Sequence, residues 1–213
     1  MDGSTTFDPV RSDLVRRAFR LERATLLWML VEAGVAIGSG IAASSLSLVA
    51  FGADSLIELA SAGVLLWRLH VELREGADFP EAVEHRASRV AGALLFTLAI
   101  YVVISAVYSF WTRSGQDFSL PGFILAIMSM PIMWWLAKAK MRTADQIGSR
   151  ALRADAVESI TCGYLSVVLV VGLLVQLLMP GWWWIDSVTS LAIVYFVVKE
   201  AREAWSGDDC CDD

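Results

Sequence analysis

Residues 47–69 read SLVAFGADSLIELASAGVLLWRL, an apolar run that holds two carboxylates, Asp54 and Glu58. A helix rises about 1.5 Å per residue, so about 20 residues cross the roughly 30 Å hydrocarbon layer of a bilayer. Helix is the expected conformation there, because lipid offers no partner to backbone N–H and C=O groups. The run therefore predicts a transmembrane helix with charged groups inside it.

Apolar runs of similar length recur along the whole chain, with the charged residues bunched between them. The chain is 56% hydrophobic and only 19% charged, whereas soluble domains carry about a quarter charged residues. We predict an all-α membrane protein of six transmembrane helices with an N-terminal segment (1–24), a transmembrane domain (25–205) and an acidic, cysteine-containing tail (206–213). The predicted spans are 25–44, 47–69, 89–111, 118–137, 155–178 and 183–198.

The connections between these spans differ in length and charge. A very short link at 43–47 predicts an antiparallel hairpin, whereas 70–88 is predicted as a charged loop and 138–154 as a basic connector. Residues 13–23 fit two interpretations, a surface amphipathic helix or the cytoplasmic extension of the first span.

The basic residues predict the orientation. With six spans, 16 of the 17 Lys and Arg residues fall on one side and only Arg113 on the other. The positive-inside rule then places both termini in the cytoplasm of a multi-pass protein in the lipid bilayer. The net charge of −6 argues against a nucleic-acid partner.

Acidic side chains inside the spans give the strongest functional signal. A charge at the middle of a bilayer costs a few kcal/mol on insertion scales, so such residues usually face the bundle interior and mark an ion or proton path. No Lys or Arg lies deep in a predicted span, so these carboxylates need protons or a metal cation. They are Glu32, Asp54, Glu58, Glu158 and Asp186.

The spacing groups four of these positions into a candidate metal site. Asp54 and Glu58 are four residues apart on one helix face, and Glu158 and Cys162 have the same spacing. Four ligands from two facing helices suit tetrahedral zinc, which binds oxygen and sulfur at roughly 2.0–2.3 Å. A thiolate also favours soft or borderline ions over magnesium or calcium.

Simpler structural roles stay open for several of these residues. Asp155 and Glu158 have the spacing of a helix-capping box, and Cys162 alone fits a small buried apolar residue. Glu32 and Asp186 fit interhelical hydrogen-bonding groups. In the tail, Cys210 and Cys211 lie among four aspartates, which fits either metal capture or a frayed terminus.

Three stretches resemble the cation diffusion facilitator family: SLSLVAFGADSLIE at 45–58, ALRADAVESITC at 151–162, and Asp186-Ser-Val. The resemblance implies a six-span exporter that exchanges divalent metal for protons. It implies zinc as the usual cargo, with cadmium, manganese, iron or cobalt in some members, and a homodimer formed through the transmembrane helices. It implies no enzyme activity and no cofactor.

The sequence departs from this family's usual pattern at the ligand positions. Glu58 stands where Asp is usual, and Glu158 and Cys162 stand where the family has His or Asp followed by Asp; metal choice depends on these positions. The chain also ends soon after the sixth span, so we expect a short member without the family's cytoplasmic C-terminal domain, in a bacterial inner membrane. The alternative function is a metal-binding scaffold or sensor partner that moves no ions.

The predicted site has one geometric difficulty. Counted from the outer ends of their spans, Asp54 and Glu58 lie about 10–20 Å deep, whereas Glu158 and Cys162 lie about 25–35 Å deep. The fifth span must therefore tilt or protrude outward for the two pairs to meet.

Overall fold

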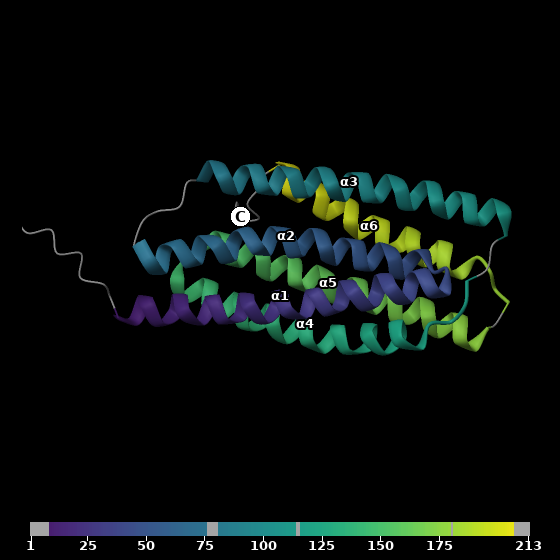
Figure 1. The fold of residues 1–213 in the computed structure, drawn as a ribbon, viewed down its shortest axis with the longest axis horizontal. Helices are drawn as coiled ribbons and strands as arrows, with labels where there is room; N and C mark the ends of the chain where they lie inside the picture. The colour runs from purple at the N-terminus through teal and green to yellow at the C-terminus, as the bar shows by residue number, and fades with distance from the viewer. Residues whose placement is uncertain (1–8, 76–80, 114–115, 180, 207–213) are drawn as a thin grey trace, which may run out of the picture.

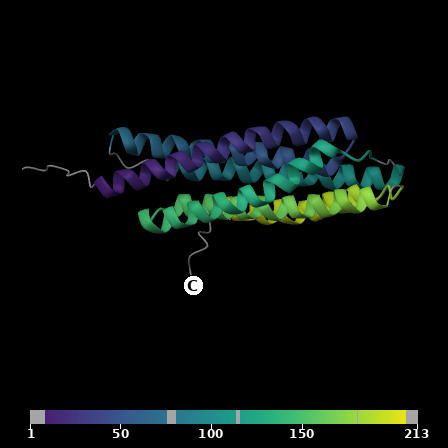
Figure 2. The same cartoon turned by 90° about the horizontal axis from the view of Figure 1, so that it is seen from below.

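The computed structural model describes residues 9–75, 81–113, 116–179 and 181–206, which form six α-helices and no strand. The helices lie side by side in one elongated bundle (Figure 1), and the same arrangement is seen from below in Figure 2. Successive helices alternate in direction, so α6 runs toward the end of the bundle where α1 begins and stops short of it (Figure 1). The helices are α1 (Pro9–Ala43), α2 (Leu46–Glu75), α3 (Glu81–Thr112), α4 (Leu120–Ile147), α5 (Arg150–Leu178) and α6 (Ile185–Ser206).

Five of the described helices, α1 to α5, are long and apolar enough to cross a membrane. Helix α6 has 22 residues, with Asp186 in its first turn and charged residues over its last two turns. Large apolar side chains cover the outside of α3, including Ile104 and Trp111, as expected of a surface that faces lipid. The prediction of an all-α membrane protein is confirmed, while the cytoplasmic location of the termini stays a prediction.

The helices extend further than the predicted spans. Helix α1 runs without a break from Pro9, so residues 13–23 extend the first span and do not form a separate surface helix. The predicted connector at 138–154 is wrong, because α4 continues to Ile147 and α5 begins at Arg150. Gly148 ends α4 with a φ of 72°, and the Ser149 side chain accepts a hydrogen bond from Leu152 N at the start of α5. The predicted spans are too short because hydropathy identifies only the apolar part of each helix, whereas these helices continue into charged segments.

Asp186 fastens the start of α6 to the start of α2. Its carboxylate accepts hydrogen bonds from the backbone N–H groups of Leu46 (2.7 Å) and Ser47 (3.3 Å), and from the hydroxyls of Ser45 and Ser47. The first N–H groups of a helix have no partner within the helix, so Asp186 caps α2 from another helix. These bonds place the starts of α2 and α6 at one level, and Asp186 therefore has the interhelical hydrogen-bonding role considered from the sequence.

A buried ion cluster joins α1, α4 and α5 nearer the opposite end. The side chain of Lys140 is fully buried, and its ammonium contacts the Asp155 carboxylate directly. The same ammonium lies 3.4 Å from Glu22 Oε1 and 3.4 Å from Ser159 Oγ. Two expectations from the sequence are corrected here. No basic residue was expected deep inside the bundle, yet Lys140 is buried there. Asp155 is not a helix cap, because α5 begins five residues before it, and Glu158 is therefore not its partner in a capping box.

We expect Asp186→Ala to destabilise the protein by about 1–3 kcal/mol, because it removes a helix cap and leaves buried donors without partners. Asp186→Asn keeps one oxygen acceptor and should cost less. Thermal unfolding of the purified protein in detergent measures both. Equal unfolding temperatures for Asp186→Ala and the unmodified protein would show that this contact is unimportant.

We expect Lys140→Met to destabilise the fold by about 3–5 kcal/mol, since it leaves Glu22 and Asp155 buried without their cation. Lys138→Met is the matched control, because Lys138 is exposed on the same helix. Adding Asp155→Asn to Lys140→Met should restore part of the loss. Similar unfolding temperatures for the Lys138 and Lys140 variants would contradict this expectation.

Candidate metal site

Helix α2 places Asp54 and Glu58 inside the bundle. Asp54 is 0% exposed and Glu58 is 4% exposed. None of their four carboxylate oxygens has a hydrogen-bond partner among the described residues. Buried polar groups in proteins are nearly always partnered, and unpaired buried charge is more costly still. Two adjacent acids without donors therefore form a site that requires a cation or protons.

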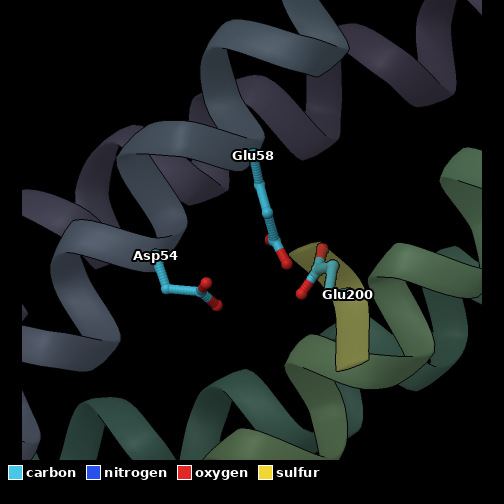
Figure 3. A group of neighbouring side chains, drawn as sticks. All are labelled: Asp54, Glu58 and Glu200. Carbon is cyan, nitrogen blue, oxygen red and sulfur yellow. The ribbon is translucent and has the colours of Figure 1, made fainter. Parts of the chain in front are cut away.

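A third carboxylate, Glu200 of α6, completes this group. One oxygen from each of Asp54, Glu58 and Glu200 can be chosen so that all three lie within 4.8 Å of one another. Figure 3 shows the Glu58 and Glu200 carboxylates directed toward each other, with Asp54 directed toward the same space from the preceding turn of α2. Oxygens around a zinc ion at about 2.0–2.2 Å are roughly 3.4 Å apart, so a modest contraction would bring these three onto one ion.

The predicted ligand Glu158 lies on the wall of the same space. Glu58, Glu158 and Glu200 line a small cavity of about 20 Å³, together with Ile57, Ser61, Ala91 and Leu95. A volume of about 10–15 Å³ on this measure holds one water molecule, so the cavity accommodates a single ion or water. Glu158 is half-buried and does not belong to the tight group of three oxygens.

The geometry also resolves the difference in depth between the two pairs. At about 1.5 Å per residue, Glu58 lies roughly 18 Å from the start of α2, and Glu158 lies about 30 Å from the end of α5. Helix α5 extends past the start of α2 at that end of the bundle (Figure 1). Protrusion of α5 therefore brings Glu158 to the level of Glu58.

Cys162 does not belong to the tight group of three carboxylates. It is fully buried, and its thiol donates a hydrogen bond of 3.6 Å to Glu32 Oε1 on α1. Glu32 thus has an interhelical hydrogen bond, as considered from the sequence. Whether Glu158 and Cys162 bind metal stays a prediction. Cys210 and Cys211 lie outside the described residues.

Glu200 is the site residue that the sequence analysis missed. The sixth span was predicted to end at residue 198, so Glu200 fell outside it and was not considered as a ligand. The helical spacing along α6 could have identified Glu200. Asp186, Ser190, Ile193 and Val197 recur every three to four residues and are buried, and Glu200 continues that face.

We expect Glu200→Gln to weaken binding of Zn²⁺ to the purified protein by about tenfold or more, because it removes one charged ligand from the group. Glu203→Gln is the matched control, since Glu203 lies one turn further along α6 with a side chain that is 42% exposed. Isothermal titration calorimetry measures both affinities. Equal affinities for the two variants would exclude Glu200 from the site.

Comparison with known proteins places this geometry in a family. Residues 23–206, which hold every carboxylate of the group, match the cation efflux transmembrane domain. The chain is also similar to an uncharacterized transporter of Synechocystis sp. (strain ATCC 27184 / PCC 6803 / Kazusa), with 27% identity over 182 residues. That match covers 84% of this chain and 56% of the relative, so the chain spans little more than half the length of that protein. The chain therefore belongs to the cation efflux family.

Proposed function

We propose that this protein transports divalent metal cations across a membrane through the group formed by Asp54, Glu58 and Glu200. The observation that carries the proposal is the burial of all four Asp54 and Glu58 oxygens without a hydrogen-bond donor among the described residues. Their convergence with Glu200 gives a ligand set of suitable size for one metal ion. Membership of the cation efflux family supports cation movement as the purpose of this site.

Glu158 and Cys162 extend the proposed site along α5. Glu158 shares the cavity with Glu58 and Glu200, so a small side-chain movement would make it a fourth ligand. Cys162 adds sulfur, which suits zinc and cadmium better than manganese. We therefore propose zinc as the main cargo, with cadmium, manganese, iron and cobalt as the ions to compare with it.

Exchange for protons follows from the chemistry of the ligands. A buried carboxylate without a donor is stable either protonated or bound to a cation, so metal and protons compete for the same oxygens. In the proposed cycle, the site binds metal from the cytoplasm, becomes accessible from the other side and releases the ion as protons replace it. The gradient that drives protons inward then drives metal outward.

The distribution of basic residues supports the direction of export. Arg16 and Arg20 lie in the first turns of α1, Arg142 and Arg202 in the last turns of α4 and α6, and Arg113 directly after the end of α3. Because successive helices alternate in direction (Figure 1), the first four lie on the side of the bundle where α1 begins, and Arg113 lies on the other side. The positive-inside rule places the side where α1 begins in the cytoplasm. We propose both termini there, in a bacterial inner membrane, and a homodimer formed through the transmembrane helices.

The test is transport by the purified protein in proteoliposomes, with zinc, cadmium, manganese, iron and cobalt supplied in turn. Asp54→Ala should reduce metal flux and metal-driven proton movement at least about 100-fold, because it removes a buried ligand from the centre of the site. Asp117→Asn is the control, since Asp117 is exposed outside the helices. Retained coupling in Asp54→Ala would exclude this site.

The same assay separates transport from metal binding alone. Unmodified protein that binds zinc but moves neither zinc nor protons would favour a scaffold or sensor partner, and it would overturn the proposed transport.

A further inference from the structure

We propose that α1 carries a binding site for one phospholipid with an anionic head group, on the face of the helix that points away from the bundle. Residues three or four apart lie on one side of a helix. The face, which we call the α1 stripe, consists of exposed residues at this spacing: Arg16, Arg20, Arg23, Leu27, Val31 and Gly34. The inference does not depend on the proposed metal transport, because it concerns the outer surface of the protein.

The α1 stripe changes from charged to apolar along its length. Its first three residues are arginines, whereas the next two, Leu27 and Val31, are apolar and yet 64% and 51% exposed. Gly34 follows them, and a side-chain carbon added there would meet no heavy atom within 4 Å, so the surface is open at that point. A basic part followed by an open apolar part matches a phospholipid, which has an anionic head group and apolar acyl chains.

The arginines lie at the depth of lipid head groups. Counted from the opposite end of α1 at Ala43, Arg23 is about 30 Å away and Arg20 about 35 Å away, at about 1.5 Å per residue. The hydrocarbon layer is about 30 Å thick, and each head-group layer adds about 5–8 Å. With Ala43 at the far edge of the hydrocarbon layer, Arg20 and Arg23 therefore lie beside lipid phosphates. Leu27 and Val31 then lie beside the acyl chains of the same leaflet.

A hollow beside the arginines gives a head group space. It has a volume of about 650 Å³ and is lined by Asp13, Arg16, Phe19 and Arg20. Ligand pockets in proteins range over roughly 300–1,000 Å³. The Phe19 ring packs against His70 of α2 with the ring centroids 6.0 Å apart, so a second helix supports the wall of the hollow. The hollow therefore has room for a lipid head group beside two guanidinium groups.

The charges favour a phosphate-bearing lipid over a second copy of the chain. Arginine binds phosphate through two parallel hydrogen bonds, and clusters of basic residues at the end of a membrane span attract anionic lipids. Arg17, which is exposed beside the α1 stripe, adds a fourth basic residue. Within the part of the chain that the structure describes, Arg16, Arg20 and Arg23 form no ion pair. Two parallel copies that met along the α1 stripe would bring like charges together at the same depth.

The experiment measures how strongly the full chain, purified in a mild detergent, retains added lipid. Mixed micelles supply phosphatidylglycerol or phosphatidylcholine with the same acyl chains, and native mass spectrometry counts the bound lipid. We expect one phosphatidylglycerol to be retained at least about tenfold more strongly than phosphatidylcholine. Arg20→Gln combined with Arg23→Gln should remove most of this preference. Asp13→Asn should strengthen it, because that change removes a negative charge from the hollow.

The matched control is Lys138→Gln combined with Arg142→Gln. Both side chains are exposed on α4. They lie about 27 Å and 33 Å from the start of that helix at Leu120, at about 1.5 Å per residue. The control pair therefore removes the same charge at nearly the same depth and leaves the hollow unchanged, so it should keep the preference for phosphatidylglycerol. Size-exclusion chromatography first checks that every variant is a single folded species.

Three results of these measurements would overturn the inference. Equal retention of the two lipids would exclude an anionic site. Equal losses in the α1 and α4 pairs would reduce the effect to a general attraction between basic helix ends and the membrane. Glycerol 1-phosphate carries the phosphate without acyl chains, and binding as tight as that of phosphatidylglycerol would mean that the hollow takes a soluble phosphate compound.

Gly34→Leu tests the other possible occupant of the α1 stripe, a second copy of the chain. The added side chain meets open space, so the fold should be retained. We expect the mass of the protein in detergent, measured by light scattering, to stay unchanged. A fall from dimer to monomer would show that a second copy covers the stripe, and it would overturn the inference. Metal flux is measured separately in proteoliposomes, so failure of the proposed transport and failure of lipid retention are distinguishable.

Discussion

Every carboxylate inside this bundle must find a donor or a cation within the protein, because water is largely absent there. The structure meets this requirement in two ways. Asp186 accepts backbone and hydroxyl hydrogen bonds at the start of α2, and Asp155 contacts the ammonium of Lys140. Asp54 and Glu58 have neither kind of partner among the described residues. The contrast separates the acids that hold helices together from those proposed to take up an exchangeable ion.

The satisfied acids also position the unsatisfied ones. Because Asp186 fixes the starts of α2 and α6 at one level, Glu58 and Glu200 reach the same depth after a similar number of turns. The Lys140 cluster joins α4 and α5 one turn from Glu158, so the wall of the cavity is tied to the neighbouring helix. These contacts lie outside the proposed ligand group and yet determine which carboxylates can share an ion.

Much of the architecture could be predicted from the sequence. Apolar length predicts helices that can span a membrane, and the four-residue spacing correctly places Asp54 and Glu58 on one buried face. Helix ends were predicted less well, because a charged segment such as that around Lys140 continues the helix while lowering its hydropathy. The same effect removed Glu200 from the predicted sixth span. A charge near the end of an apolar run can face the interior when neighbouring helices cover it.

The sequence by itself determined the helical class, the alternation of apolar and charged segments and the acidic character of α2. It also determined the supply of possible ligands, including the sulfur of Cys162. Only the tertiary structure decided which acids meet. Glu58 joins Glu200, which is more than 140 residues away, and Cys162 joins Glu32, 130 residues away. The physical reason is that the spacing of residues along one helix determines only which face they share. The depth of a side chain in the bundle, and the residue it meets, depend on the position of each helix along its neighbours. Contacts such as that of Asp186 with the start of α2 fix this position.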